Sequence, residues 1–84
     1  PAATAPAKLS FKDRHALETL PASMAKLEKE IAVLRDWLAD PGLYARDPKG
    51  FETKSKGLAE REAALAAAEE EWLRLELLRE ELEG

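Results

Sequence analysis

The chain contains no cysteine, a single histidine and only four scattered glycines among its 84 residues. Without cysteine it has no disulfide bonds or thiolate metal sites, and a reducing compartment is the natural expectation. His15 has neither a cysteine nor a second histidine with which to share a metal ion, so we expect it on the surface. The glycines form no phosphate-binding loop. The sequence therefore predicts no metal site and no cofactor within this chain.

Long apolar runs are also missing. No segment approaches the roughly 18 apolar residues that a membrane-spanning helix needs, and no secretory signal is present. The chain begins at Pro1 rather than Met. We interpret this as the start of a fragment of a longer protein, with residues 1–7 as a linker end.

The composition is that of a long helix or coiled coil, with 36% charged residues and a hydrophobic 45% that is mostly Ala and Leu. The net charge of −4 is unevenly placed. From residue 62 onward eight Glu oppose two Arg, whereas residues 1–61 carry eleven basic against nine acidic residues. The basic surplus is thus confined to the first part of the chain.

One stretch, residues 48–82, organises the rest. Phe51, Leu58, Leu65 and Trp72 recur every seven residues, with further apolar residues between them. This spacing predicts a helix, roughly 50 Å long, that packs along its length against another helix. Asp47 is the expected N-cap, followed by Pro48 in the first turn.

The partner helices precede it. Ser10 with Asp13 three residues later predicts a helix start, and we expect a short helix over residues 11–19. Pro21 predicts a break at Thr19–Leu20, followed by a second helix over residues 21–39. Asp40-Pro41-Gly42 ends it, and Leu43-Tyr44 is expected to pack over the connection.

The fold class that follows is all-α: an antiparallel two-helix coiled-coil hairpin with the short N-terminal helix packed at its open end. In the predicted register, the sequence numbers of two residues that face each other across the helices add up to 92. This register places Leu9 and Phe11 near Leu78 and Leu82. In this register the predicted core pairs are Leu38 with Lys54, Leu34 with Leu58, Ile31 with Arg61, Leu27 with Leu65, Met24 with Ala68, Leu20 with Trp72 and Leu17 with Leu75.

Two positions depart from the apolar pattern. Arg61 stands at a core position, and we expect its stem to lie on Ile31 and its head to reach Glu28 or Glu30. A register-setting role is the alternative. Gly57 lies in mid-helix, where it costs about 1 kcal/mol relative to Ala. We expect the missing side chain to make room for Trp37.

A catalytic site is not expected, because a two-helix hairpin offers no enclosed pocket and the Glu69-Glu70-Glu71 run is typical of a solvated helix face. The basic residues allow two interpretations. They are either solubilising charge interleaved with Glu or contacts to nucleic-acid phosphates. The candidate phosphate contacts gather near the connection and at the N-terminus: Arg35, Arg46, Lys49, Lys54, Lys56, Lys8, Lys12 and Arg14. Tyr44 could stack on a base, or pack against Leu38.

Several separated motifs carry a family resemblance. They are Lys8-Leu9-Ser10-Phe11-Lys12, Leu17-Glu18-Thr19-Leu20-Pro21, Leu27-Glu28-Lys29-Glu30-Ile31, Asp40-Pro41-Gly42-Leu43-Tyr44, Asp47-Pro48 with Phe51, and Glu71-Trp72 with Leu75-Glu76. Over about residues 8–82 the chain resembles the C-terminal coiled-coil domain of ABC-F ATPases of the Uup type. It departs from that pattern at Ala16, where Glu is expected, and around Gly57.

The resemblance implies a cytoplasmic parent with two ATP-binding cassettes, which would use ATP and Mg²⁺, and a C-terminal module that binds DNA. The wider family works on ribosomes. Three hypotheses follow for this chain: a nucleic-acid-binding appendage that touches DNA or ribosomal RNA, a protein-interaction arm that docks on the cassettes or the ribosome, and a dimerisation coiled coil. We expect the isolated chain to be monomeric and non-catalytic.

Overall fold

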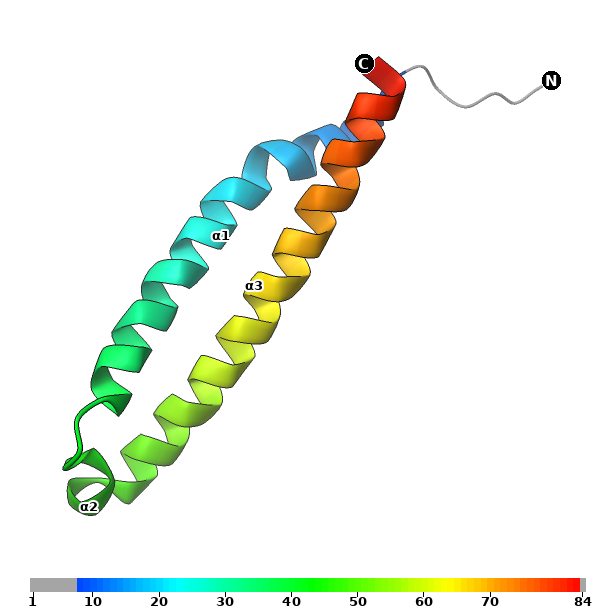
Figure 1. The fold of residues 1–84 in the computed structure, drawn as a ribbon. Coiled ribbons are helices and arrows are strands. Elements are labelled where there is room, and N and C mark those ends of the chain that lie inside the picture. Colours follow the sequence, from blue (N-terminus) through cyan, green and yellow to red (C-terminus); the bar gives the residue numbers. More distant parts are fainter. Residues whose placement is uncertain (1–7, 84) are drawn as a thin grey trace.

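A computed structural model describes residues 8–83 as an extended hairpin of two long helices joined by a short one (Figure 1). The long helices are α1 (Phe11–Leu38) and α3 (Pro48–Glu83), and α2 (Leu43–Arg46) lies in the connection. The rod measures 66 × 19 × 16 Å. We call the end that carries α2 the tip, and the opposite end, where α1 begins and α3 ends, the open end. The predicted linker, residues 1–7, lies outside the described residues.

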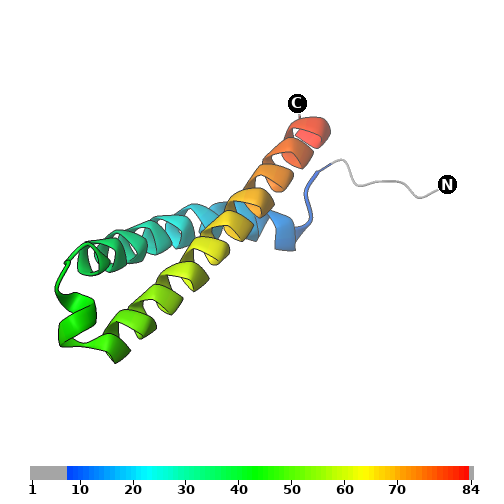
Figure 2. The same cartoon turned by 60° about the horizontal axis from the view of Figure 1, so that its bottom comes forward.

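The prediction of a separate N-terminal helix is wrong: residues 11–38 form one continuous helix with Pro21 inside it. Proline removes one backbone hydrogen bond and crowds the preceding turn, which bends a helix without always ending it. Figures 1 and 2 show α1 bending in this part and crossing α3 near the open end. Packing of α1 on α3 on both sides of Pro21 outweighs the local cost of the proline.

The start of α1 follows the predicted capping pattern. The Ser10 hydroxyl accepts a hydrogen bond from the Asp13 N–H at 3.1 Å, and Leu9, just before the cap, is buried. The expectation for Phe11 is wrong, because its side chain is 82% exposed. It stands on the outer side of the first turn, where its ring stacks along His15 with centroids 6.2 Å apart. His15 is exposed as predicted.

The start of α3 also follows the prediction. The Asp47 carboxylate accepts from the Gly50 N–H at 3.0 Å, and Pro48 is the first helical residue. A Cβ on Gly50 would stand 2.1 Å from Asp47 Oδ2, so glycine is what allows this cap to fold back onto the helix. The prediction did not include α2, whose Leu43 is buried over the tip.

The predicted core positions of both helices are all buried or half-buried. Four side chains are fully covered: Leu9, Ile31, Leu43 and Leu75. Two contacts between the helices differ from the predicted register by a single residue. They pair Arg61 with Glu30 at 2.9 Å and place the Lys54 ammonium 4.9 Å from the Trp37 ring centroid. These two contacts lie close to the register predicted from the heptad pattern, whereas the Arg35–Glu62 pair lies five residues from it.

Gly57 does not make room for Trp37, as we had expected. A Cβ there would meet Arg61 Nη1 at 3.1 Å and Leu34 Cδ1 at 3.8 Å. The Arg61 guanidinium donates to the Gly57 carbonyl at 3.2 Å and to Glu30 at 2.9 Å, the latter as predicted. The glycine therefore leaves space for Arg61, which crosses the seam between the helices.

Candidate nucleic-acid interface

The arginines and the lysines of the hairpin differ in whether they form ion pairs. Across residues 8–83 every ion pair is made by an arginine, and no lysine takes part in one. Arg35 pairs with Glu62 across the helices at 2.6 Å, and Arg46 pairs with Asp40 at 2.7 Å. Both arginines were predicted as phosphate contacts, but the structure places each against a carboxylate that competes for its charge.

Arg46 and Asp40 belong to the framework of the tip. The hydrogen bond from Arg46, together with one from the Gly42 N–H, lowers the pKa of the Asp40 carboxyl. Gly42 stands in ordinary helical geometry, and a Cβ on it would lie 3.1 Å from Arg46 Nη1. The missing side chain thus lets the guanidinium fold back over the turn.

The tip lysines occupy two environments. Lys49 and Lys56 are exposed and lie seven residues apart on α3, so they share one face about 10 Å apart along the axis. Lys54 is half-buried, and its ammonium stands over the Trp37 ring as a cation–π contact. Of the three, Lys49 and Lys56 are therefore the ones whose charge faces solvent.

Aromatic side chains accompany these lysines. Tyr44 does not pack away against the core: it is 63% exposed and meets Phe51 edge-to-face with ring centroids 5.3 Å apart. A hollow of about 330 Å³ lies between α2 and the start of α3. It is lined by Tyr44, Pro48, Lys49, Phe51, Glu52 and Ser55.

Sequence reasoning treated Phe51 only as a core residue and missed this hollow. The signal that points to it is the four-residue helix Leu43–Arg46, whose buried Leu43 is followed at once by an exposed tyrosine. The hollow places an aromatic surface beside a lysine whose charge faces solvent. Proteins that bind single-stranded nucleic acid use this combination of aromatic and basic side chains.

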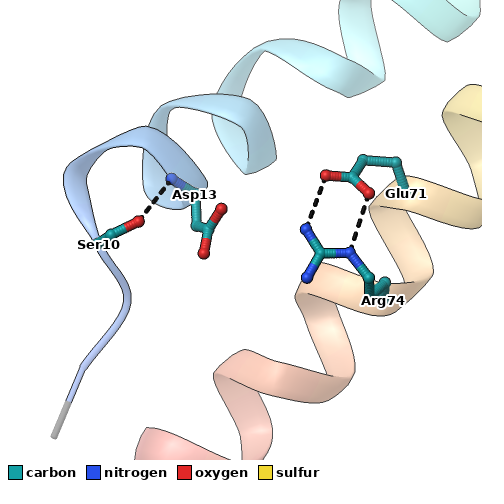
Figure 3. Close-up of polar contacts among 4 residues, drawn as sticks. All are labelled: Ser10, Asp13, Glu71 and Arg74. Atoms are coloured by element: carbon teal, nitrogen blue, oxygen red, sulfur yellow. Dashed lines mark hydrogen bonds and ion pairs between the residues drawn. The ribbon is translucent and has the colours of Figure 1, made fainter. Parts of the chain in front are cut away.

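The basic residues of the open end differ in their surroundings. Lys12 is near enough to Glu71 to contribute to its lowered pKa, after the larger effect of the hydrogen bond from Arg74. Figure 3 shows Glu71 and Arg74 in a two-bond pair, at 2.8 and 2.9 Å, close to the start of α1. Arg14 donates to the Leu9 carbonyl at 3.4 Å. Lys8 is exposed.

The eight predicted residues therefore do not form one site. The structure brings Lys49, Lys54 and Lys56 together at the tip, where Arg35 and Arg46 are engaged by carboxylates. Lys8, Lys12 and Arg14 lie at or just before the start of α1, which Figure 1 shows at the opposite end of the hairpin from α2. Lys12 there lies near the acidic half of α3. The tip is therefore where three of the predicted lysines lie together.

Residues 8–83 hold no group of three or more His, Cys, Asp or Glu side chains that could bind a metal ion. No helix in the same range is long and apolar enough to cross a membrane.

Comparisons with known proteins agree with the motifs. The ABC transporter C-terminal domain family matches residues 8–77. The ATP-binding protein Uup of Caulobacter vibrioides is 47% identical over 78 residues, which is 93% of this chain and 13% of that protein. The ATP-binding protein Uup of Haemophilus influenzae is 38% identical over 77 residues, or 92% of this chain and 12% of that protein.

A third relative, the Uup-like ATP-binding protein of Haemophilus influenzae, is 38% identical over 82% of this chain and 15% of its own length. The chain thus spans only a small part of the length of these curated relatives. No solved structure matches it. Because the family match covers most of the chain and the helical hairpin accounts for its motifs, the chain belongs to the ABC transporter C-terminal domain family.

Proposed function

We propose that this domain is the nucleic-acid-binding arm of a Uup-like ABC-F ATPase and that it contacts phosphates with its tip. Lys49 and Lys56 supply the principal contacts, and Lys54 supports them from its place over Trp37. The parent's ATP-binding cassettes would hydrolyse ATP while the arm holds DNA or structured RNA. Contact through phosphates makes the binding sensitive to salt and poor in sequence information.

The observation that carries the proposal is the direction of charge along α3. A helix macrodipole favours acidic residues at the N-terminus and basic residues at the C-terminus. In α3 the N-cap Asp47 follows this rule, but the first turn after it contains Lys49 and no acidic residue, and the last turn contains no basic residue and is rich in Glu. Each misplaced charge costs roughly 0.3–1 kcal/mol. Helix stability explains the Asp47 cap but not Lys49, and an anionic ligand at the tip would account for that lysine.

The acidic half of α3 restricts the direction from which a nucleic acid can approach the hairpin. The eight Glu from residue 62 onward repel phosphates along the open half of the rod. A nucleic acid would thus meet the hairpin at its tip instead of lying along its length. The arm then acts as a probe that extends from the cassettes.

The test is a titration of the 84-residue chain with duplex DNA and structured RNA over a salt series. We expect the logarithm of the binding constant to fall with log[salt] with a slope of about −2, since each neutralised duplex phosphate contributes about −0.9. The double variant Lys49→Glu/Lys56→Glu should lose this binding. The matched control, Lys26→Glu/Lys29→Glu, makes the same charge change on exposed positions of α1 and should bind more nearly like the parent.

Two outcomes contradict the proposal. One is the absence of binding to either nucleic acid at about 50 mM salt. The other is an equal loss of nucleic-acid binding in the two double variants. That result would show that binding depends on the net charge of the chain and not on the position of the lysines at the tip.

A second candidate function, protein docking, is favoured by exposed leucines near the open end. Leu73 and Leu77 are 53% and 54% exposed, and Leu73 borders a hollow that also contains Pro21 and Trp72. This surface could contact the cassettes of the parent or a ribosomal protein. It could instead pair two hairpins, and sedimentation over a concentration range separates these cases, because a concentration-independent monomer removes the dimer.

A further inference from the structure

The hollow at the tip combines aromatic side chains with a lysine in its walls. Tyr44 and Phe51 supply two rings at right angles, with centroids 5.3 Å apart. Tyr44 keeps 63% of its surface exposed, so most of the tyrosine is free to meet a ligand. The volume of the hollow, about 330 Å³, is at the small end of the range for ligand pockets.

The charges on the rim indicate which ligand fits. The exposed Lys49 lines the hollow, and its ammonium group can pair with a phosphate. Glu52, one turn further along α3, also lines the hollow and is exposed. An ionised carboxylate only accepts hydrogen bonds, so it matches a ligand that carries amino donors. A nucleotide whose base has an exocyclic amino group carries both complementary parts.

A base can reach this hollow only when it is unstacked. Bases inside a duplex stack on their neighbours and present only their edges in the grooves. Unpaired bases, by contrast, stack on aromatic side chains, with a contribution of about 1–3 kcal/mol per base. A phosphate contact alone would not distinguish these two forms.

We infer that the tip hollow binds an unpaired base of single-stranded nucleic acid, stacked on Tyr44, with its phosphate on Lys49 and its amino group donating to Glu52. The inference rests on the proposed function and narrows it to a substrate class. Cytosine presents such an amino group to a carboxylate, whereas thymine and uracil carry carbonyl oxygen at the same ring position. The arm therefore prefers single strands over duplex, and cytosine over thymine.

The first experiment compares the 84-residue chain with Tyr44→Leu and Tyr44→Phe in binding single-stranded cytosine oligomers of about 12 nucleotides and a duplex of equal length. Tyr44→Leu keeps an apolar contact with Phe51 but removes the stacking face. It should weaken single-strand binding about tenfold, leave duplex binding unchanged and keep the salt slope of the parent. Tyr44→Phe should bind like the parent. Helical circular dichroism confirms that the variants are folded.

The second experiment compares cytosine and thymine oligomers at neutral pH. We expect the parent to prefer cytosine about fivefold, in line with the net contribution of a single solvent-exposed hydrogen bond. Glu52→Gln can donate as well as accept, so the ratio should approach one. The ratio is the readout because removing a negative charge strengthens binding to both oligomers.

Each alternative outcome has a distinct meaning. Unchanged single-strand binding in Tyr44→Leu, or an equal loss on duplex, overturns the stacking site while the phosphate-binding function stands. Equal affinity of the parent for cytosine and thymine overturns the role of Glu52. Self-association of the parent that Tyr44→Leu abolishes would assign the hollow to a second copy of the chain. Failure of every nucleic acid to bind overturns the proposed function itself.

Discussion

The tip and the open end of this hairpin are closed in different ways. At the open end α1 bends across α3, and Leu9 and Leu75 are buried. Arg74 and Arg79 there pair with glutamates of their own helix. At the tip one buried leucine, Leu43, covers the turn, while Tyr44 and the neighbouring lysines face solvent. The open end thus closes through buried leucines and ion pairs within α3, whereas the tip leaves an exposed tyrosine beside exposed lysines.

Removing the packing of the open end should have the largest effect on stability. Leu75→Ala deletes the most completely buried side chain, with 0% exposure, and should cost about 2–4 kcal/mol of unfolding free energy. For a domain of this size that corresponds to a fall in Tm of roughly 10–25 °C. Chemical denaturation followed by circular dichroism measures it. The control Leu77→Ala, on the same helix at 54% exposure, should change stability by less than about 0.5 kcal/mol.

Filling the gap beside Arg61 should produce a smaller, stabilising change. Gly57→Ala gains up to about 1 kcal/mol of helix propensity, and its Cβ displaces only the flexible end of Arg61. We expect a net gain of about 0.5 kcal/mol in denaturant unfolding. Fluorescence of Trp37 should stay as it is, because the indole does not occupy this gap. A stability loss above about 1 kcal/mol would show that the Arg61 contact stabilises the hairpin by more than the helix propensity that glycine loses relative to alanine.

Reversing the charge of Lys49 should separate function from stability at the tip. Lys49→Glu places an acidic residue in the first turn of α3, and we expect the domain to become about 0.3–1 kcal/mol more stable. Its nucleic-acid binding should nevertheless fall, with a salt slope reduced by about 1. Thermal unfolding and titration of the same sample check both. A variant that loses stability and binding together would make Lys49 a structural residue.

The smallest expected effect is that of acid. The pKa of Asp40 is lowered by its hydrogen bond from Arg46, and that of Glu71 by its hydrogen bond from Arg74. A lowered folded pKa gives stability that is present above the unfolded value, near 4, and is lost as pH falls through the lower folded value. These two groups should therefore cause little change between about pH 5 and 8 and a slight loss of stability below about pH 4.

Two tryptophans report on the two ends during this titration. Trp37 lies beside Asp40 near the tip, and Trp72 directly follows Glu71. Asp40→Asn should remove the acid-dependent change near Trp37 and leave that near Trp72. Fluorescence of single-tryptophan variants separates the two signals. A transition near neutral pH at either tryptophan would contradict the assignment to these carboxyls.

Much of this fold could be predicted from the sequence because it depends on local rules. The heptad spacing determines which positions face the partner helix, and Asp47 and Ser10 cap helices as their side chains dictate. Pro21 was misjudged because a tertiary contact decides whether a proline ends a helix or bends it. Phe11 was misjudged because a one-residue change at a helix start turns a side chain from the core to solvent.

The candidate site was less predictable for a related reason. Its basic residues could be named from the sequence, but a charge count cannot tell a free cation from a paired one. Arg46 folds back onto Asp40 only because the turn brings them within 2.7 Å, and Lys54 stands over Trp37 only in the assembled hairpin. The hollow beside Tyr44 depends on the short helix α2, which four residues are too few to predict.

The most direct test of the account is a backbone NMR titration of the 84-residue chain with single-stranded and duplex DNA at low salt. The account predicts shift changes concentrated at residues 42–58, largest around Tyr44 and Lys49 with the single strand, and little change beyond residue 62. Changes concentrated at the start of α1 or along the acidic half of α3, with the tip unperturbed, would contradict it.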